Sequence, residues 1–144
     1  MRLTIDTNIL VAALRSPAGA SRKLLHLLAD GYFEVICSTA MMLEYESVLK
    51  RPEHLSVFQL TPYEIDKFLD GLAALVTPIT PFFLWRPMLK DPADEHVLEA
   101  AVNGQADIIV TFNLKDFKPA LTKFGIEVLN PSNTLLRIKN GKHK

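Results

Sequence analysis

The stretch RLTIDTNIL, residues 2–10, begins as a short apolar run with the composition of a β-strand. The run ends in Asp6, Thr7 and Asn8, and apolar residues resume at once, which leaves room for a short helix directly after the strand. Asp, Thr and Asn all cap helices well, so capping is one interpretation of Asp6. The other is a binding role, because ligands of open parallel sheets bind beyond the carboxyl ends of the strands.

Further along the chain, segments with strand character alternate with helical patterns. The strand candidates are short, apolar and β-branched: residues 2–6, FEVIC at 33–37, DIIVT at 107–111 and IEVL at 126–129. The helices are expected over about residues 18–30, 40–51, 62–76, 92–103 and 131–138. This alternation predicts an α/β fold whose strands pair in parallel through right-handed crossovers. The proline-rich segment 78–91 either holds one more strand or passes as a loop.

Four of the expected helix starts share one device, a cap-type residue followed by proline. They are Ser16-Pro17, Thr61-Pro62, Asp91-Pro92 and Asn130-Pro131. Proline suits the first helical position because it has no N–H group to leave without a partner. Thr61 is also followed three residues later by Glu64, which is the spacing of a capping box.

The composition indicates one ordinary globular domain, expected over residues 1–138 and followed by a basic tail at 139–144. Lys and Arg together equal Asp and Glu at 16 each, so no overall basic field points to nucleic acid. The single cysteine cannot form an internal disulfide, which fits a reducing cytoplasm. We see no signal-peptide pattern and no apolar run of about 18 residues, so we expect a cytoplasmic protein without a membrane segment.

Asp94 is the carboxylate whose position is hardest to explain by local structure. On a helix, the apolar residues Val97, Leu98 and Ala101 follow it at i+3, i+4 and i+7, so Asp94 faces the buried side. A carboxylate there is costly unless it is paired or binds a metal ion. With Asp91 as the N-cap, an acid at this position can also support the helix start. Capping explains the acid, but it explains less well why the acid faces the core.

Two other regions add carboxylates. The helix MMLEYESVLKR carries Glu44 and Glu46 on opposite borders of its apolar stripe, and periodicity does not choose between them. The segment TFNLKDF, residues 111–117, follows the apolar run DIIV and therefore places Asn113 and Asp116 near the same edge of the sheet as Asp6.

The chain thus offers Asp6, Asp94, Asp116 and a glutamate at 44 or 46 at positions that can meet. Carboxylates crowded together repel one another, so a functional cluster of this kind needs a cation. Oxygen ligands with few histidines or thiols suit Mg²⁺ or Mn²⁺. Such ions can activate water and stabilise the oxygens of a phosphodiester displacement.

Four blocks of sequence carry a family resemblance over essentially the whole chain: IDTNIL, LEYESVLKR, DPADEHVLEAA and ADIIVTFNLKDF. In this order and spacing they resemble the PIN-domain ribonucleases, and among them the VapC-like toxins of bacterial and archaeal toxin–antitoxin pairs. The resemblance implies a three-layer α/β/α sandwich with a central parallel sheet of four or five strands. It also implies a nuclease site of three or four acids that depends on Mg²⁺ or Mn²⁺.

The resemblance assigns the acids residue by residue. Asp6 matches the first acid of the family, Glu44 the second, which selects it over Glu46, and Asp94 the third. At the fourth place the family often has an acid where this chain has Asn113, and Asp116 follows three residues later. The fourth ligand is therefore either Asp116 or Asn113. Four matched polar residues would support the acids: Thr7, Asn8, Thr111 and Asn113.

In the mechanism that the resemblance implies, Asp6 and Asp94 hold the metal directly, while Glu44 and Asp116 act through water. The substrate would be RNA, and a small antitoxin protein would be the partner. A homodimer is left open. The alternative from another class is a PIN fold without catalysis that serves as a binding module. Retention of Asp6, Glu44 and Asp94 argues against that alternative.

Overall fold

The computed structural model describes residues 1–81, 89 and 91–141, and its centre is a sheet of five parallel strands. The strands lie in the order β3-β2-β1-β4-β5. Their bounds are β1 Arg2–Ile5, β2 Glu34–Cys37, β3 Thr77–Pro78, β4 Ile108–Val110 and β5 Glu127–Leu129. The predicted α/β fold with a parallel sheet is therefore confirmed. Strand β3 is the one strand of the sheet that adds to the four strand candidates of the sequence. Of the proline-rich segment 78–91, residues 82–88 and 90 lie outside the described residues.

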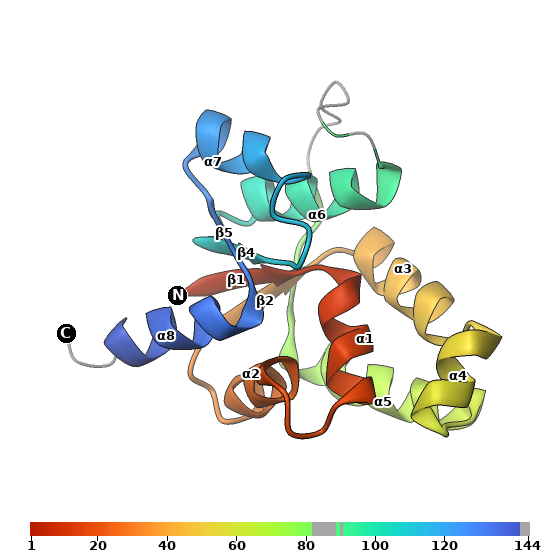
Figure 1. Ribbon diagram of the computed structural model, residues 1–144. Helices are drawn as coiled ribbons and strands as arrows, with labels where there is room; N and C mark the ends of the chain where they lie inside the picture. The colour runs from red at the N-terminus through yellow and green to blue at the C-terminus, as the bar shows by residue number, and fades with distance from the viewer. Residues whose placement is uncertain (82–88, 90, 142–144) are drawn as a thin grey trace.

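Eight helices connect and cover the strands within the described part of the chain. Their bounds are α1 Thr7–Arg15, α2 Ala20–Ala29, α3 Thr39–Leu49, α4 Pro52–Phe58, α5 Pro62–Leu75, α6 Pro92–Asn103, α7 Lys118–Phe124 and α8 Pro131–Gly141. Figure 1 shows α6 and α7 above the sheet and α1, α2, α5 and α8 below it, which gives the expected three layers. None of these helices is long and apolar enough to cross a membrane.

Three of the four expected cap-and-proline helix starts are confirmed. Thr61 and Glu64 form the complete capping box of α5. The Asp91 carboxylate accepts the Ala93 N–H of α6 at 2.9 Å. The Asn130 side chain accepts an N–H from the first turn of α8 at 2.8 Å.

The expected helix start at Ser16-Pro17 is wrong. Ser16 is instead the C-cap of α1, and its N–H donates to the Ala12 carbonyl at 2.9 Å. The next helix, α2, begins at Ala20 after an N-cap glycine, Gly19, so Pro17 lies in the turn between the two helices. A proline after a cap-type residue is equally suited to such a turn, and periodicity alone does not separate the two cases.

Other boundaries also differ from the prediction. The seven-residue helices α4 and α7 were not predicted, because a helix of two turns is too short to show an apolar period. Helix α8 continues to Gly141, three residues past the predicted end, and takes in the first part of the expected basic tail. Residues 142–144 lie outside the described residues.

The sheet brings distant strand ends together. Ile5, the last residue of β1, pairs with Val110 of β4, and the Asp6 N–H extends this ladder to the Val110 carbonyl at 3.0 Å. On the far side of β4, the Thr111 N–H donates to the Leu129 carbonyl at 3.0 Å. Asp6 and Thr111 therefore leave the sheet side by side, although 105 residues separate them in sequence.

A close approach of α6 to β2 fixes the depth at which α6 lies. A Cβ atom at Gly104, the C-cap of α6, would come within 2.5 Å of Ile36 Cγ2. Ile36 belongs to the buried centre of β2, so it has no room to withdraw. The absence of a side chain at Gly104 lets the helix lie against the sheet and sets the position of Asp94 at its other end.

Candidate active site

Asp6 joins the end of β1 to the start of α1, and both of its carboxylate oxygens are held. Oδ1 accepts the Thr7 N–H at 2.8 Å, so Asp6 does cap α1. Oδ2 accepts the hydroxyl of Thr111 at 2.7 Å. Only 7% of Asp6 is exposed. Asp6 can therefore cap α1 and also serve in binding, because the hydrogen bonds from Thr7 and Thr111 hold its carboxylate in one orientation.

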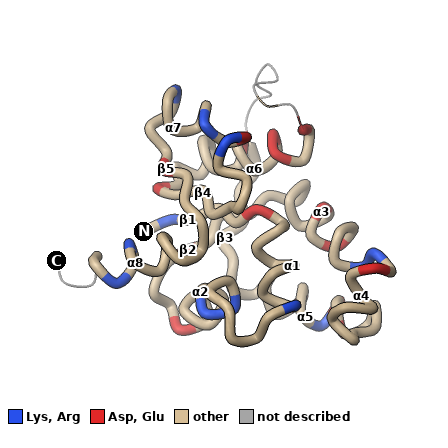
Figure 2. The backbone as a smooth tube through the Cα atoms, in the orientation of Figure 1, with Lys and Arg blue, Asp and Glu red and all other residues tan. Residues whose placement is uncertain are grey.

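The exposed edge of Asp6 opens into a pocket of about 280 Å³ at the carboxyl end of the sheet. Side chains from α1, α3, α4, α6 and the loop after β4 meet there. The polar residues of the lining are Asp6, Thr7, Asn8, Glu44, His54, Asp91, Asp94 and Asn113. In Figure 2, red acidic segments lie at the start of α1, on α3 and at the start of α6, around this region.

Asp94 lies in the first turn of α6 and is 8% exposed, so the prediction that it faces the buried side is confirmed. Its side chain makes no hydrogen bond to the described part of the chain, whereas Asp91 caps the helix. Burial is the main cause that raises the pKa of Asp94 to about 7, and the charges of Asp6, Asp91 and Asp116 add to it. Among the described residues, Asp94 therefore has no positively charged partner.

The pKa of Asp6 is also raised, first by burial and then by the charges of Asp91 and Glu44. The hydrogen bonds from Thr111 and Thr7 act in the opposite direction. The charge of Asp6 in turn raises the pKa of Asp94, because like charges at short range disfavour the ionised form.

Glu44 and Glu46, which periodicity left undecided, have different surroundings. The buried Tyr45 between them donates its hydroxyl to the Ile5 carbonyl and so fastens α3 to the end of β1. Glu44 lines the acidic pocket. Glu46 instead pairs with Lys50 at 3.0 Å along the surface of α3. The structure thus places Glu44, and not Glu46, with Asp6 and Asp94.

The loop after β4 carries Asn113 and Asp116, the two candidates for the fourth ligand, and they have different surroundings. Asn113 lines the pocket, and its N–H donates to the Thr111 hydroxyl oxygen at 3.0 Å. Asp116 is exposed and does not line the pocket, but its charge is close enough to raise the pKa of Asp94. Thr111 connects this loop to Asp6, because it accepts from Asn113 and donates to the Asp6 carboxylate.

Sequence reasoning missed two polar residues of this pocket, Asp91 and His54. Asp91 was recognised as a helix cap, and that role is confirmed, but a cap residue can also face a site. His54 lies on α4, a helix that was not predicted, and its ring stacks on Phe58 with centroids 5.7 Å apart. Pro52 at the first position of α4 was a signal that could have located that helix.

The donor set fits a hard cation. Four carboxylates line the pocket, and none of them forms an ion pair within the described residues. The Asn8 side-chain oxygen is buried and has no hydrogen-bond partner there. Among the described residues, no three His, Cys, Asp or Glu side chains are grouped closely enough to bind an ion together. Mg²⁺ usually keeps several waters and takes one or two carboxylates, so two direct ligands suffice.

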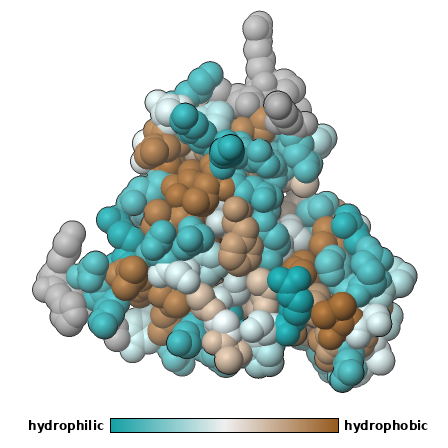
Figure 3. All heavy atoms as spheres, in the orientation of Figure 1, coloured by the Kyte–Doolittle hydropathy of each residue, from teal (hydrophilic) through white to brown (hydrophobic). Residues whose placement is uncertain are grey.

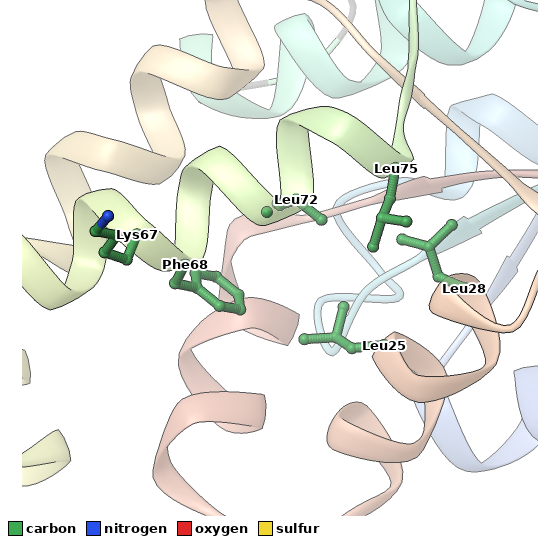
Figure 4. Close-up of a pocket in the computed structure, with 7 residues that line it drawn as sticks. Leu25, Leu28, Lys67, Phe68, Leu72 and Leu75 are labelled. Carbon is green, nitrogen blue, oxygen red and sulfur yellow. The ribbon is translucent and has the colours of Figure 1, made fainter.

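Apolar side chains reach the surface elsewhere. Figure 3 shows hydrophobic residues gathered near β5 and α7, where Leu121 is 53% exposed. A second apolar surface is a groove of about 290 Å³ between α2 and α5. In Figure 4, Leu25 and Leu28 face Phe68 and the leucines of α5 across it. Within the described part of the chain, Lys67 is the one charged residue that lines this groove, and the rest of the lining is apolar apart from Gly71.

Comparisons with known proteins agree with this geometry. A family profile described as PIN domain matches residues 2–115. A chain of VapBC2 from Rickettsia felis, solved bound to a DNA fragment from its promoter, has the same fold, with a TM-score of 0.57 and 17% sequence identity. That match covers 90% of this chain and 98% of the other. A search of curated proteins gives no match. The profile spans most of the sequence, and the chain belongs to the PIN domain family.

Proposed function

We propose that this protein is a metal-dependent endoribonuclease that hydrolyses phosphodiester bonds of RNA. The observation that carries the proposal is the convergence of Asp6, Glu44 and Asp94 in one pocket at the carboxyl edge of the sheet. PIN domains are nucleases, and these three residues stand at the positions that resemble the acids of the family. A cation held by these acids would also explain how a protein of zero net charge can take a phosphate there, since the ion would supply positive charge where the phosphate lies.

The four acids would have different roles at the metal ion. Asp6 and Asp94 would hold Mg²⁺ or Mn²⁺, Asp6 in an orientation fixed by Thr7 and Thr111. Glu44 and Asp116 would orient the attacking water. When bound, the ion supplies positive charge that stabilises the scissile phosphate and acidifies water. The amide of Asn113 is a further polar group that substrate or water can meet.

Glu44 and Glu46 provide a matched pair of variants for testing this site. Glu44→Gln is expected to lower the cleavage rate of end-labelled single-stranded RNA at least 100-fold, on the order of a lost metal-linked group. Glu46→Gln removes the same charge from the same helix, but only from a surface pair with Lys50, so it should stay near wild type. Cleavage should require Mg²⁺ or Mn²⁺ and stop with EDTA. If Glu46→Gln is the inactive variant, the assignment of the second acid is wrong.

We further propose that the nuclease is the toxin of a toxin–antitoxin pair and acts in the cytoplasm. The VapBC2 neighbour and the resemblance to VapC-like toxins support a small antitoxin as the partner. A segment of that antitoxin would cover the acidic pocket with Arg or Lys side chains, which suits a pocket lined by four carboxylates.

Growth of the native host tests the toxin role. Overexpression of this chain alone should slow growth, and co-expression of an adjacent small gene should restore it. The Asp6→Asn variant should not slow growth, because the effect requires RNA cleavage. Equal growth with wild type and Asp6→Asn would contradict the toxin role, while the nuclease assay in vitro would still decide the enzymatic activity.

A further inference from the structure

A second pocket, of about 240 Å³, is lined by neighbours in sequence of residues that line the acidic one. It lies between the turn that joins α1 to α2, the start of α8 and Phe112 in the loop after β4. Two pairs of consecutive residues connect the pockets. Val11 lines the acidic pocket and Ala12 lines this one, while Asn113 lines the acidic pocket and Phe112 lines this one. The two pockets therefore share α1 and the loop after β4 as walls.

The two pockets differ in charge. Of the residues that the structure describes, none that lines the second pocket is charged, although four carboxylates line the first. Its polar groups are the hydroxyls of Ser16, Ser21 and Ser132 and the side-chain amide of Asn130. Its largest apolar surface is the ring of Phe112, which is 50% exposed. Such a lining suits a neutral, planar group with hydrogen-bonding atoms along its edge. It contains no positive charge among the described residues that would attract a phosphate.

The hydroxyl of Ser21 is a polar group of this pocket that is available for a hydrogen bond to a ligand. The residue is 4% exposed, yet its hydroxyl has no hydrogen-bond partner in the described part of the chain. Two other buried hydroxyls are paired, since Thr111 donates to Asp6 and Thr134 donates to the Asn130 carbonyl at 2.8 Å, whereas the Thr4 hydroxyl is buried in the sheet without a partner among the described residues. The fully buried polar side-chain atoms without a partner in the described part of the chain are Thr4 Oγ1 and Asn8 Oδ1, so the Ser21 oxygen is still reached from the pocket and can meet a ligand there.

We propose that this pocket binds one unpaired base of the RNA strand, next to the phosphate held at the carboxylates. The base would stack on Phe112, as bases of single-stranded RNA do on exposed aromatic rings, and its polar edge or ribose hydroxyl would meet Ser21 and its neighbours. A volume of about 240 Å³ holds one base but is smaller than the roughly 300–1,000 Å³ of pockets for drug-sized ligands. The proposal rests on the proposed ribonuclease function.

Free nucleosides test the base pocket separately from the nuclease, because they carry no phosphate and need no metal. The isotope-labelled protein is titrated in EDTA with adenosine, guanosine, cytidine and uridine, and the amide resonances are followed by NMR. We expect saturable shifts at Phe112, Ser21 and Ser132 for at least one nucleoside. Phe112→Ala should weaken this binding about 5- to 100-fold, which is the usual loss when a stacking ring is removed. Leu121→Ala, another exposed apolar residue, should leave the affinity unchanged.

RNA cleavage supplies the second readout. Phe112→Ala should raise KM for single-stranded RNA and lower kcat/KM by a similar factor, and Ser132→Phe, which adds bulk at an exposed rim position, should do the same. Nucleoside binding without any RNA cleavage by wild type would support the pocket and contradict the nuclease. RNA cleavage by wild type without nucleoside shifts at these residues, or with shifts that persist in Phe112→Ala, would overturn the base pocket and leave the nuclease standing.

Discussion

Asp6→Asn is expected to abolish detectable cleavage of single-stranded RNA while the protein stays folded. A residue that acts on a metal ligand from outside typically contributes 10- to 100-fold, so the loss of a direct ligand should exceed about 100-fold. The substitution keeps the size of the side chain and one acceptor oxygen, which can still accept the Thr7 N–H that starts α1. The measurement is the initial rate of cleavage in Mg²⁺ and in Mn²⁺, with circular dichroism to confirm the fold.

Asp70→Asn is the matched control for this experiment. Asp70 is an exposed carboxylate on α5, away from the acidic pocket, and its neutralisation changes the net charge of the protein by the same amount. The Asp70→Asn variant should cleave RNA at the wild-type rate. Full activity of a folded Asp6→Asn variant would sink the assignment of the active site, whereas equal losses in both variants would point to a general effect of charge on RNA binding.

The fold could be predicted because its signals are local. Short β-branched runs at 33–37, 107–111 and 126–129 alternate with helices that begin at marked caps, and such alternation in one domain leads to a parallel sheet. Parallel strands collect their carboxyl ends at one edge, so the meeting of Asp6 with the loop after β4 followed from topology alone. The burial of Asp94 could be predicted because the sequence places this acid on the same helix face as the apolar residues that follow it.

The remaining parts of the site depend on tertiary contacts that leave no periodic signal. Glu44 and Glu46 flank the same stripe, so periodicity did not separate them and the family resemblance was needed to select Glu44. In the structure, Glu44 lines the pocket, while Glu46 pairs with Lys50. His54 reaches the pocket from a helix of seven residues, which has no readable period. The free hydroxyl of Ser21 becomes informative only when its burial is known, because serine on a predicted helix is usually solvated.

Asp94→Asn is expected to lose RNA cleavage as Asp6→Asn does, and also to melt at a higher temperature than wild type in EDTA at pH 8. The physical reason is that Asp94 is buried among Asp6, Asp91 and Asp116, and removing its charge relieves their repulsion. Wild type should gain stability with Mg²⁺ by RT ln(1 + [L]/Kd), which is about 1.4 kcal/mol at ten times Kd. The variant should gain much less, because one ligand is missing. Thermal melts across a Mg²⁺ series measure both effects.

The pH dependence of the melting temperatures tests whether the charge of Asp94 causes the difference in stability between wild type and Asp94→Asn. The pKa of Asp94 is raised from 3.8 to about 7 in the folded protein, so the folded state binds a proton more tightly than the unfolded state between these values. The contribution of Asp94 to wild-type stability in EDTA should therefore fall as the pH rises from about 4 to about 7, and the variant lacks this contribution. The advantage of Asp94→Asn should be small near pH 4.5 and full at pH 8.

A helix-capping role for Asp94 makes the opposite forecast. Neutralising an acid that only supports the first turn of α6 should cost about 0.5–1 kcal/mol at pH 8, with no dependence on metal. Asp91→Asn provides the comparison, because Asp91 is the residue whose carboxylate accepts the Ala93 N–H. A variant Asp94→Asn that melts below wild type in EDTA, with an unchanged response to Mg²⁺, would show that Asp94 serves the helix and that the proposed metal site is wrong.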